Sequence, residues 1–389
     1  MKLLHTSDWH VGKTVRGHSR AAEHQAVLAE MVQLANTHEV DLVLVAGDLF
    51  DSAAPTAESE QIVYQGLLDL AAVAPVVAVA GNHDNARRLS AVARLLELGR
   101  VTVATEPRSP SGGGVLEVTT EGGERARIAL VPFVSQRAIV RSDALMSEPA
   151  FRNAQTYADR LQKVVGALTG TFASDSVNIV LGHLFVTGAA AGGGERPAHL
   201  IDEYGVSGTA FSAGCSYVAL GHLHRAQSMP GATAIHYCGS PLQLDFGEQG
   251  NAPSVNLVEA EAGLPARVDR VALTEGRSMV TLSGRLDELA ALAAEDTKRW
   301  LRIEVDEDPR PGLAEEVREM FGDSAVEVRI VPRSRPTMTA KRQRLSEGRS
   351  PSQLFGDYLD ENQTSDPRLH RLFDELHDEV YEQQRSVVS

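Results

Sequence analysis

The sequence predicts an α/β fold, because short apolar segments alternate with amphipathic segments long enough to form helices. In the strand expected at 41–46, residues 42–46 form a continuous apolar run, and residues 76–80 form a second run of strand length. Strands of this kind are buried on both faces, as in parallel sheets that helices cover. From residue 277 a shorter alternation of strands and helices begins. We therefore expect one large α/β domain and a second, small α/β domain.

The elements of the large domain follow from hydrophobic periodicity. Strands are expected at 2–6, 41–46, 76–80, 128–131, 177–181, 217–220, 254–258 and 267–273. Helices are expected at 19–36, 57–73 and 154–168, and the glycine-rich segment 187–197 is expected to be a loop or lid. The large domain should span residues 1–273.

The rest of the chain divides into three parts. Residues 277–332 predict strand, helix, strand, helix, strand at 279–282, 286–294, 300–305, 313–321 and 326–331. Residues 333–350 are basic and contain Pro and Ser, which indicates a linker or an arm that contacts DNA or a partner. Residues 351–389 contain two helical segments with a Leu and aromatic stripe, 352–360 and 368–381. Such a stripe would expose apolar area, so we expect this tail to bind a partner.

Composition limits the function classes. The net charge of −15 argues against a protein that coats nucleic acid by charge alone. It does not exclude an enzyme that reaches a phosphate through bound cations. The longest apolar run, residues 67–80, contains Asp69 and Pro75 and is shorter than the ~20 residues of a membrane helix. Cys215 and Cys238 are expected to be buried thiols, and the protein is expected to be cytoplasmic.

Metal-ligand side chains follow five of the apolar runs, usually after a Gly or Ser. In open α/β sheets, sites form at the carboxyl ends of the strands. Carboxylate, amide and imidazole ligands without thiolate suit divalent ions such as manganese, iron or zinc. This set is too large for one catalytic ion, but it fills two adjacent sites if one carboxylate, best Asp48, is shared. Two adjacent ions predict hydrolysis of a phosphoester. The candidate ligands are Asp8, His10, Asp48, Asn82, His183, His222 and His224.

His83 remains after the ligands are assigned. Beside Asn82 it would face the leaving oxygen, where a general acid or a charge stabiliser is needed. Asp51 could orient His83 and keep it protonated, since a nearby carboxylate raises the pKa of an imidazole. Asp84 is the rival for this role, unless it only caps the loop.

The motifs resemble a known family. The ligand motifs are similar to the complete signature of calcineurin-like metallophosphoesterases: Asp8-Trp9-His10, Gly47-Asp48, Gly81-Asn82-His83-Asp84, Gly182-His183 and Gly221-His222-Leu223-His224. The flanking residues narrow the resemblance to the SbcD family, the nuclease subunits of SbcC–SbcD complexes: His5 to Gly12, Gly47 to Asp51, Ser240-Pro241-Leu242 and Phe246.

This resemblance implies a core of two sheets covered by helices, a small α/β capping domain and a C-terminal helical tail. It implies a manganese-dependent exonuclease and endonuclease that acts on double-strand DNA ends and hairpins. One ion would take Asp8, His10, Asp48 and His224, and the other Asp48, Asn82, His183 and His222.

The resemblance also implies partners and further contacts. His83 would stabilise the transition state, whereas the role of Asp51 is less defined because some relatives carry His there. The tail would dock on the coiled coil of an SbcC-type ABC ATPase, and the nuclease would form a homodimer within a heterotetramer. Lys13, Arg16 and Arg20 could touch the DNA backbone, although a solvated loop also explains them.

Two other functions compete. A calcineurin-like phosphatase or small-molecule phosphodiesterase would share the same metal core. A scaffold of this fold that only binds a protein is disfavoured by the intact ligand set and His83.

Overall fold

The computed structural model of the protein describes residues 1–134, 150–195, 205–293 and 299–331, and residues 355, 359, 368, 369, 372 and 373. The chain divides into two compact units, residues 1–305 with 310–330, and residues 306–309 with 331–389. The predicted linker at 333–350 and most of the predicted tail lie outside the described residues.

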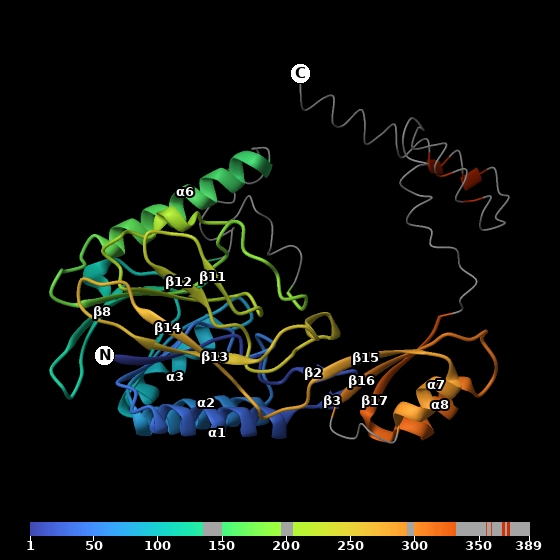
Figure 1. Ribbon diagram of the computed structural model, residues 1–389. Coiled ribbons are helices and arrows are strands. Elements are labelled where there is room, and N and C mark those ends of the chain that lie inside the picture. The colour runs from blue at the N-terminus through green and yellow to red at the C-terminus, as the bar shows by residue number, and fades with distance from the viewer. Residues whose placement is uncertain are drawn as a thin grey trace. The chain divides into compact units, whose positions relative to one another are not determined.

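Two six-stranded sheets form the centre of the first unit (Figure 1). The first sheet has the order β14 (Arg267–Ala272), β13 (Ser254–Glu259), β1 (Lys2–Thr6), β4 (Leu42–Val45), β5 (Val76–Val79), β6 (Val101–Ala104). The second has the order β11 (Gln227–Met229), β12 (Ala234–Tyr237), β10 (Tyr217–Gly221), β9 (Val177–His183), β8 (Arg125–Val131), β7 (Val115–Thr119). The strands β1, β4, β5 and β6 run parallel, as do β8, β9, β10 and β12.

The two sheets pack face to face and share a hydrophobic core. Leu42 and Leu44 of β4 point into this core together with Ile179 of β9, whereas Val43 and Val45 point to the opposite face. This division follows from the period of two in a strand. Strands with apolar residues at every position are therefore buried on both sides, as the sequence predicts.

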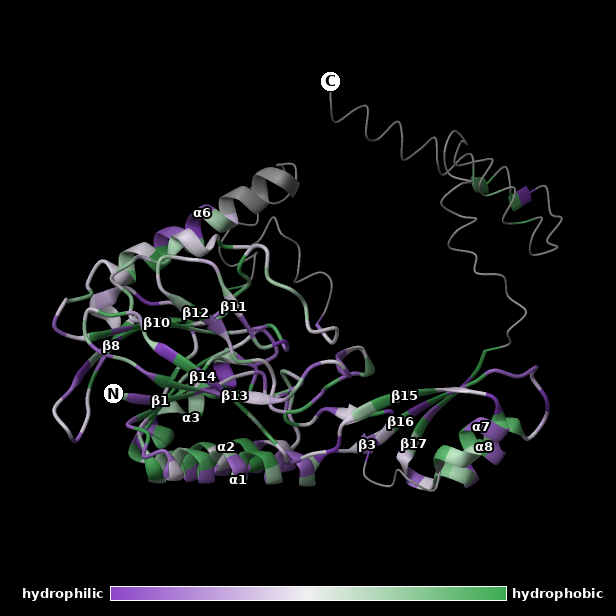
Figure 2. Ribbon diagram, viewed as in Figure 1, coloured by the Kyte–Doolittle hydropathy of each residue, from purple (hydrophilic) through white to green (hydrophobic). Residues whose placement is uncertain are grey.

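Helices cover the outer face of each sheet (Figure 1). The helices α1 (Ala21–Thr37), α2 (Ala57–Val73) and α3 (Ala86–Leu98) pack on the first sheet, and α6 (Ala150–Thr169) packs on the second. In Figure 2, α1 and α2 carry both hydrophobic and hydrophilic stretches, as expected for helices with one buried face. The predicted α/β core of two sheets covered by helices is confirmed.

Some short elements were not predicted from the sequence. The helix α3 was not predicted, although it is amphipathic and buries Leu89 and Leu96. The strands β6 and β12 each contain a polar residue, Thr102 and His236, so they lack the continuous apolar run of β4 and β5. The other short elements that were not predicted are the strands β7, β11, β2 (Thr14–Val15) and β3 (His18–Ser19). They also include the 3₁₀ turns η1 (Pro110–Gly112), η4 (Gly208–Ala210), η5 (Phe246–Glu248) and η6 (Gly322–Ser324).

The small α/β domain expected at residues 277–332, here called the small module, has the predicted element order. Its parallel sheet of β15 (Met279–Gly284), β16 (Trp300–Val305) and β17 (Ala325–Ile330) packs against α7 (Leu286–Ala293) and α8 (Leu313–Phe321). A separate cluster joins this module to the large domain: Met279 and Trp300 pack against Val15 and Phe246. The module therefore has both a core of its own and an apolar junction.

The described tail residues are helical and partly apolar. Phe355 and Leu359 fall within the first predicted tail helix, and Leu372 and Phe373 within the second. The rings of Phe355 and Phe373 stack with their centroids 4.3 Å apart. Within the described parts of the chain, none of the helices has the length and apolar character needed to cross a membrane.

Candidate metal centre

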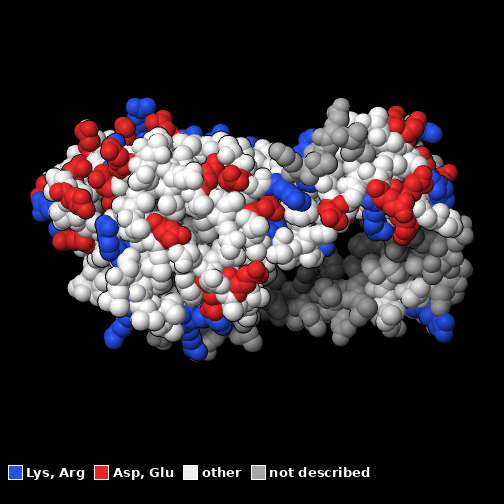
Figure 3. All heavy atoms as spheres, turned by 90° about the horizontal axis from the view of Figure 1, so that it is seen from below, with Lys and Arg blue, Asp and Glu red and all other residues white. Residues whose placement is uncertain are grey.

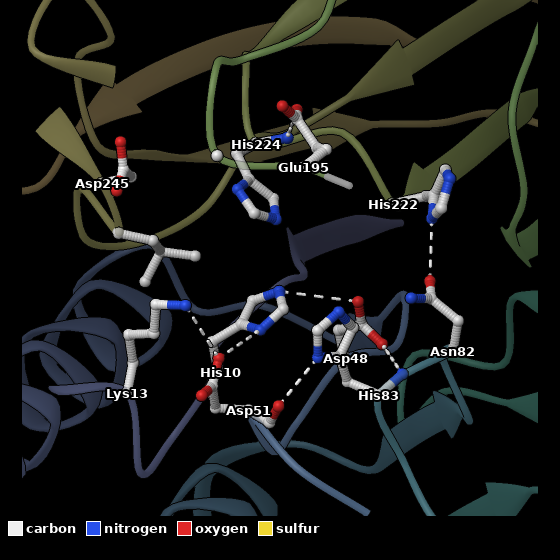
Figure 4. A pocket seen from close by; sticks show the side chains of 12 residues that line it. His10, Lys13, Asp48, Asp51, Asn82, His83, Glu195, His222, His224 and Asp245 are labelled. Atoms are coloured by element: carbon white, nitrogen blue, oxygen red, sulfur yellow. Dashed lines mark hydrogen bonds and ion pairs between the residues drawn. The ribbon is translucent and has the colours of Figure 1, made fainter. Parts of the chain in front are cut away.

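The predicted ligand loops meet at the carboxyl ends of the parallel strands. Loops after β1, β4 and β5 of the first sheet lie beside the ends of β9 and β10 of the second. Together they line a cavity of about 130 Å³, which Figure 4 shows from close by. The residues that line the cavity are His10, Lys13, Asp48, Asp51, Asn82, His83, Gly194, Glu195, His222, His224, Leu244 and Asp245.

Several candidate ligands have a strained backbone. Asp8, His10, Asp48 and His222 have φ angles of 53°, 46°, 51° and 104°, which L-residues rarely adopt. Strained residues cluster at functional sites because the surrounding structure must hold them in place. This strain marks the same loops that the ligand pattern singles out.

Two glycines explain why a small residue precedes the ligands. A Cβ atom at Gly81 would collide with the backbone N and the carboxylate of Asp48. A Cβ atom at Gly221 would collide with the carbonyl oxygen of Ala46. Glycine therefore permits loops from different strands to approach closely at this edge.

The first group of ligand atoms comes from Asp8, His10 and His224, whose ligand atoms lie within 4.8 Å of one another. The His10 Nε2 atom is buried, lies 3.5 Å from Asp48 Oδ2 and has no hydrogen-bond partner among the described residues. A buried nitrogen without a partner is costly. A cation between these atoms would satisfy it, so this group fits a divalent metal ion.

The second group surrounds Asn82. Its Oδ1 atom lies 2.9 Å from His222 Nδ1 (Figure 4) and also 2.9 Å from His183 Nε2. His183 Nε2 lies 3.4 Å from Asp48 Oδ2. Asp8, Asp48 and His183 also place ligand atoms within 4.8 Å of one another. Imidazole, amide and carboxylate atoms that converge in this way fit a second ion next to the first.

In three candidate imidazole ligands, Nδ1 contacts an oxygen atom of the protein. His183 Nδ1 donates to the carbonyl of Ala46 at 2.7 Å, and His224 Nδ1 lies 2.6 Å from Glu248 Oε1. His10 Nδ1 lies 3.5 Å from Asp51 Oδ1. Metal-binding histidines are commonly oriented by such outer partners, which leave Nε2 for the ion.

The carboxylates at the site favour positive charge on two of the candidate imidazole ligands. Burial disfavours protonation of His183, but the Asp48 carboxylate outweighs it and raises the pKa of His183 to about 9. In the same way Glu248 overcomes burial and raises the pKa of His224 to about 9. Surroundings that favour a proton on buried imidazoles also favour a metal ion there.

His83 lies beside the ligands but is held differently. Its backbone N–H donates to Asp48 Oδ1 at 2.8 Å, and its Nδ1 lies 2.8 Å from the backbone carbonyl of Asp51. The Asp51 carboxylate, which we expected to orient His83, instead lies near His10 and 3.3 Å from Lys13 Nζ. Burial is outweighed by His10 and Lys13, which lower the pKa of Asp51 to about 2. Asp51 therefore contacts His83 through its backbone carbonyl and not through its carboxylate, because the carboxylate lies against His10 and Lys13.

Asp84 has the loop-capping arrangement. Its buried carboxylate accepts hydrogen bonds from the backbone N–H groups of Gly81, Leu49 and Phe50 at 2.8, 3.3 and 3.1 Å. These bonds join the loops after β4 and β5. Asp84 is thus not the partner of His83.

The three basic residues expected to contact DNA, Lys13, Arg16 and Arg20, differ in their exposure and in their partners. Lys13 lines the cavity. Arg16 is half-exposed and pairs with Glu327 of the module at 2.8 Å. Arg20 is buried and binds Glu23 and the carbonyl of Gln243. The expected contact of Arg20 with DNA is therefore wrong, because its guanidinium is not accessible.

Sequence reasoning missed two acidic residues at the site. Glu248 is buried against the ring of His224. Glu195 accepts from the backbone N–H groups of His224, Gly192 and Gly193. Neither follows a strand, so the strand-end pattern could not find them. The residue near Glu248 that the sequence analysis did single out is Phe246, which is one of the residues that carry the family resemblance.

Two protein families match successive parts of the chain. The family described as calcineurin-like phosphoesterase matches residues 1–226. The family described as type 5 capsule protein repressor C-terminal domain matches residues 275–363. A dimetal phosphatase structure from Danio rerio aligns at 12% identity with a TM-score of 0.40, covering 70% of this chain and 99% of that one.

Two bacterial relatives align over most of the chain. The SbcD subunit of the nuclease SbcCD from Bacillus subtilis (strain 168) is 34% identical over 78% of this chain and 79% of its own length. The corresponding SbcD subunit from Escherichia coli (strain K12) is 29% identical over 96% of this chain and 97% of its own. The chain therefore belongs to the calcineurin-like phosphoesterase family and, within it, to the SbcD nuclease subunits, and it is a metal-dependent phosphodiesterase.

Proposed function

We propose that the protein is a two-metal, manganese-dependent DNA exonuclease and endonuclease that acts at double-strand ends and hairpins. The observation that carries the proposal is the convergence of two groups of ligand atoms in one cavity with His83 beside them. The relatives named as nuclease subunits support the reaction class.

The two ions would share Asp48. Asp8, His10 and His224 would complete the first site, and Asn82, His183 and His222 the second. Two bound ions supply charge that polarises a phosphoryl group and activates water. The ligand set contains no thiolate, which suits manganese.

His83 is proposed to act on the leaving oxygen. Its Nδ1 lies against the carbonyl of Asp51, which fixes the ring and leaves Nε2 as the nitrogen that can face a substrate. A hydrogen-bond donor there would stabilise the charge that develops as the phosphodiester bond breaks. Lys13, one-third exposed at the cavity, would contact a neighbouring phosphate.

The surface charge supports access to DNA at the cavity rather than over a broad face. On the face in Figure 3, acidic and basic atoms of the described residues are interspersed. The net charge is −15. Substrate phosphates would therefore be attracted mainly by the bound cations and by local residues such as Lys13.

We further propose that the protein works in the cytoplasm in an SbcC–SbcD-type complex. The tail would bind the coiled coil of an ABC ATPase, and the nuclease would be a homodimer within a heterotetramer. The match of residues 275–363 to a C-terminal family and the names of the relatives support this assembly.

The substrate class can be tested with the purified full chain and Mn²⁺. Linear duplex DNA and hairpin DNA are expected to be cleaved, whereas phosphoproteins and cyclic nucleotides are expected to remain intact. Cleavage of the latter two with intact duplex would instead identify a phosphatase or small-molecule phosphodiesterase.

Two variants separate chemistry from metal binding. His83→Ala should reduce cleavage by ~10²-fold or more, with metal content near wild type, because it removes only a stabilising group. Asp48→Ala should lose both metal and activity. Metal analysis and DNA cleavage of each variant provide the measurements, and wild-type cleavage by His83→Ala would contradict the proposed role.

A further inference from the structure

Glu248 is a buried carboxylate beside the candidate ligand His224. It lies in η5, is 1% exposed, and places Oε1 2.6 Å from His224 Nδ1. Its other oxygen, Oε2, accepts from the backbone N–H of Leu244 at 2.8 Å. Both carboxylate oxygens therefore have donors.

These contacts determine which ring nitrogen of His224 carries hydrogen. An ionised carboxylate only accepts hydrogen bonds, so His224 Nδ1 must donate. The Nε2 atom then presents its lone pair to the cavity in the neutral ring. An outer carboxylate of this kind also orients the ring and strengthens its binding to a metal.

The surrounding structure holds Glu248 in place. Gln243 Nε2 donates to the carbonyls of Glu248 and Asn251 at 3.2 and 2.8 Å. A Cβ atom at Gly194 would collide with the Glu248 carboxylate, so the glycine loop lies directly over it. Glu248 is therefore in close contact with both segments.

The segment that carries Glu248 is also tied to the small module. The ring of Phe246 packs in the junction with Met279 and Trp300, and the guanidinium of Arg302 lies 4.3 Å from its centroid. Gln243 Oε1 accepts from the backbone N–H of Met279 at 2.6 Å. The segment thus spans the distance between the module and His224.

We propose that Glu248 is a positioning residue, which sets the tautomer and orientation of His224 for one of the two metal ions. The proposal rests on the proposed function only in taking His224 as a ligand. Glu248 does not touch the substrate, and it acts through His224.

Glu248→Gln tests this directly in the full chain. A Gln oxygen can accept from either Leu244 N–H or His224 Nδ1–H, and its NH₂ group faces the other. If the oxygen accepts from His224 Nδ1–H, the NH₂ group opposes the Leu244 N–H. If the oxygen accepts from Leu244 N–H, the NH₂ group donates to Nδ1 and hydrogen moves to His224 Nε2. Titration calorimetry with Mn²⁺ should show a ~10–100-fold weaker affinity for one ion.

A double-mutant cycle distinguishes positioning from a general structural effect. In the His224→Ala background, Glu248→Gln should produce no further loss of Mn²⁺ affinity. Glu30→Gln is the matched control, because Glu30 also accepts backbone N–H bonds, from Thr274 and Glu275, away from the cavity. It should bind Mn²⁺ like wild type.

Glu248→Asp covers the case in which Glu248→Gln does not fold, as judged by circular dichroism. The Asp side chain keeps the charge but is shorter, so its carboxylate lies farther from His224 Nδ1. We expect an Mn²⁺ affinity below that of wild type. We also expect a changed visible spectrum when the protein binds Co²⁺. Wild-type affinity in a folded Gln or Asp variant overturns the proposal, as does additive loss in the cycle. If wild type binds Mn²⁺ in a Glu248-dependent way but cleaves no DNA, the proposed function fails and this inference stands.

Discussion

Gly81 shows how one residue permits the metal centre to form. It precedes Asn82 and His83, and its backbone N–H donates to Asp84 Oδ2 at 2.8 Å. Gly81→Ala would drive a Cβ atom into Asp48, so the loops after β4 and β5 must separate. We expect a loss of about 1–3 kcal/mol in the free energy of unfolding and weaker Mn²⁺ binding, measured by urea unfolding and calorimetry.

Gly166→Ala is the matched control for this substitution. Gly166 lies in α6, and a Cβ atom there would meet no atom within 4 Å. Ala in place of Gly within a helix should increase stability by roughly 0.5–1 kcal/mol and leave Mn²⁺ binding unchanged. Equal stability of the Gly81→Ala variant and wild type would contradict the proposed packing constraint.

At the scale of elements, the first turn of α1 anchors the small module. Glu23 accepts from the backbone N–H of Arg277 at 2.7 Å and from Trp300 Nε1 at 2.9 Å, and it pairs with buried Arg20. Glu23→Gln should lower the free energy of unfolding by about 1–3 kcal/mol, because Arg20 loses its charged partner. Urea unfolding at pH 7 measures the change.

The effect of Glu23 should also depend on pH. Burial opposes its ionisation, but Arg20 outweighs burial and lowers the pKa of Glu23 in the folded protein. In the unfolded chain the pKa of Glu is near ~4.3, so the stabilisation is present above that pH and lost as the pH falls through the lowered value. The difference between wild type and Glu23→Gln should therefore shrink below about pH 4. A constant difference down to pH 3 would rule out the ion pair as its source.

At the scale of the whole molecule, the tail is expected to connect the nuclease to its ATPase partner. Phe355 and Phe373 stack on each other, and Leu372 is 51% exposed. Leu372→Glu should abolish co-elution with an SbcC-type ATPase in size-exclusion chromatography, while Mn²⁺ content and DNA cleavage by the nuclease alone stay near wild type. Leu264→Glu, at another exposed leucine, is the control and should co-elute. Retained co-elution of Leu372→Glu would place the contact elsewhere.

The candidate metal ligands could be predicted from the sequence because they directly follow buried strands. The apolar runs before Asp8, Asp48 and Asn82 identify three neighbouring strand ends, and parallel strands bring such ends to one edge. Glu248 and Glu195 have no such flanking pattern, because they lie in loops that only tertiary packing brings to His224. The role expected for the Asp51 carboxylate was wrong for the same reason: its competitors His10 and Lys13 were not evident from spacing.

The sequence by itself determined the α/β class, the element order of the small module and the set of candidate ligands, because these depend on local periodicity and on residues next to strand ends. The tertiary structure decided which side chains hold those ligands, that Arg20 is buried in an ion pair and that the Glu248 segment connects His224 to the module. Those features depend on contacts between residues far apart in the chain, and local pattern contains no information on which distant groups will meet.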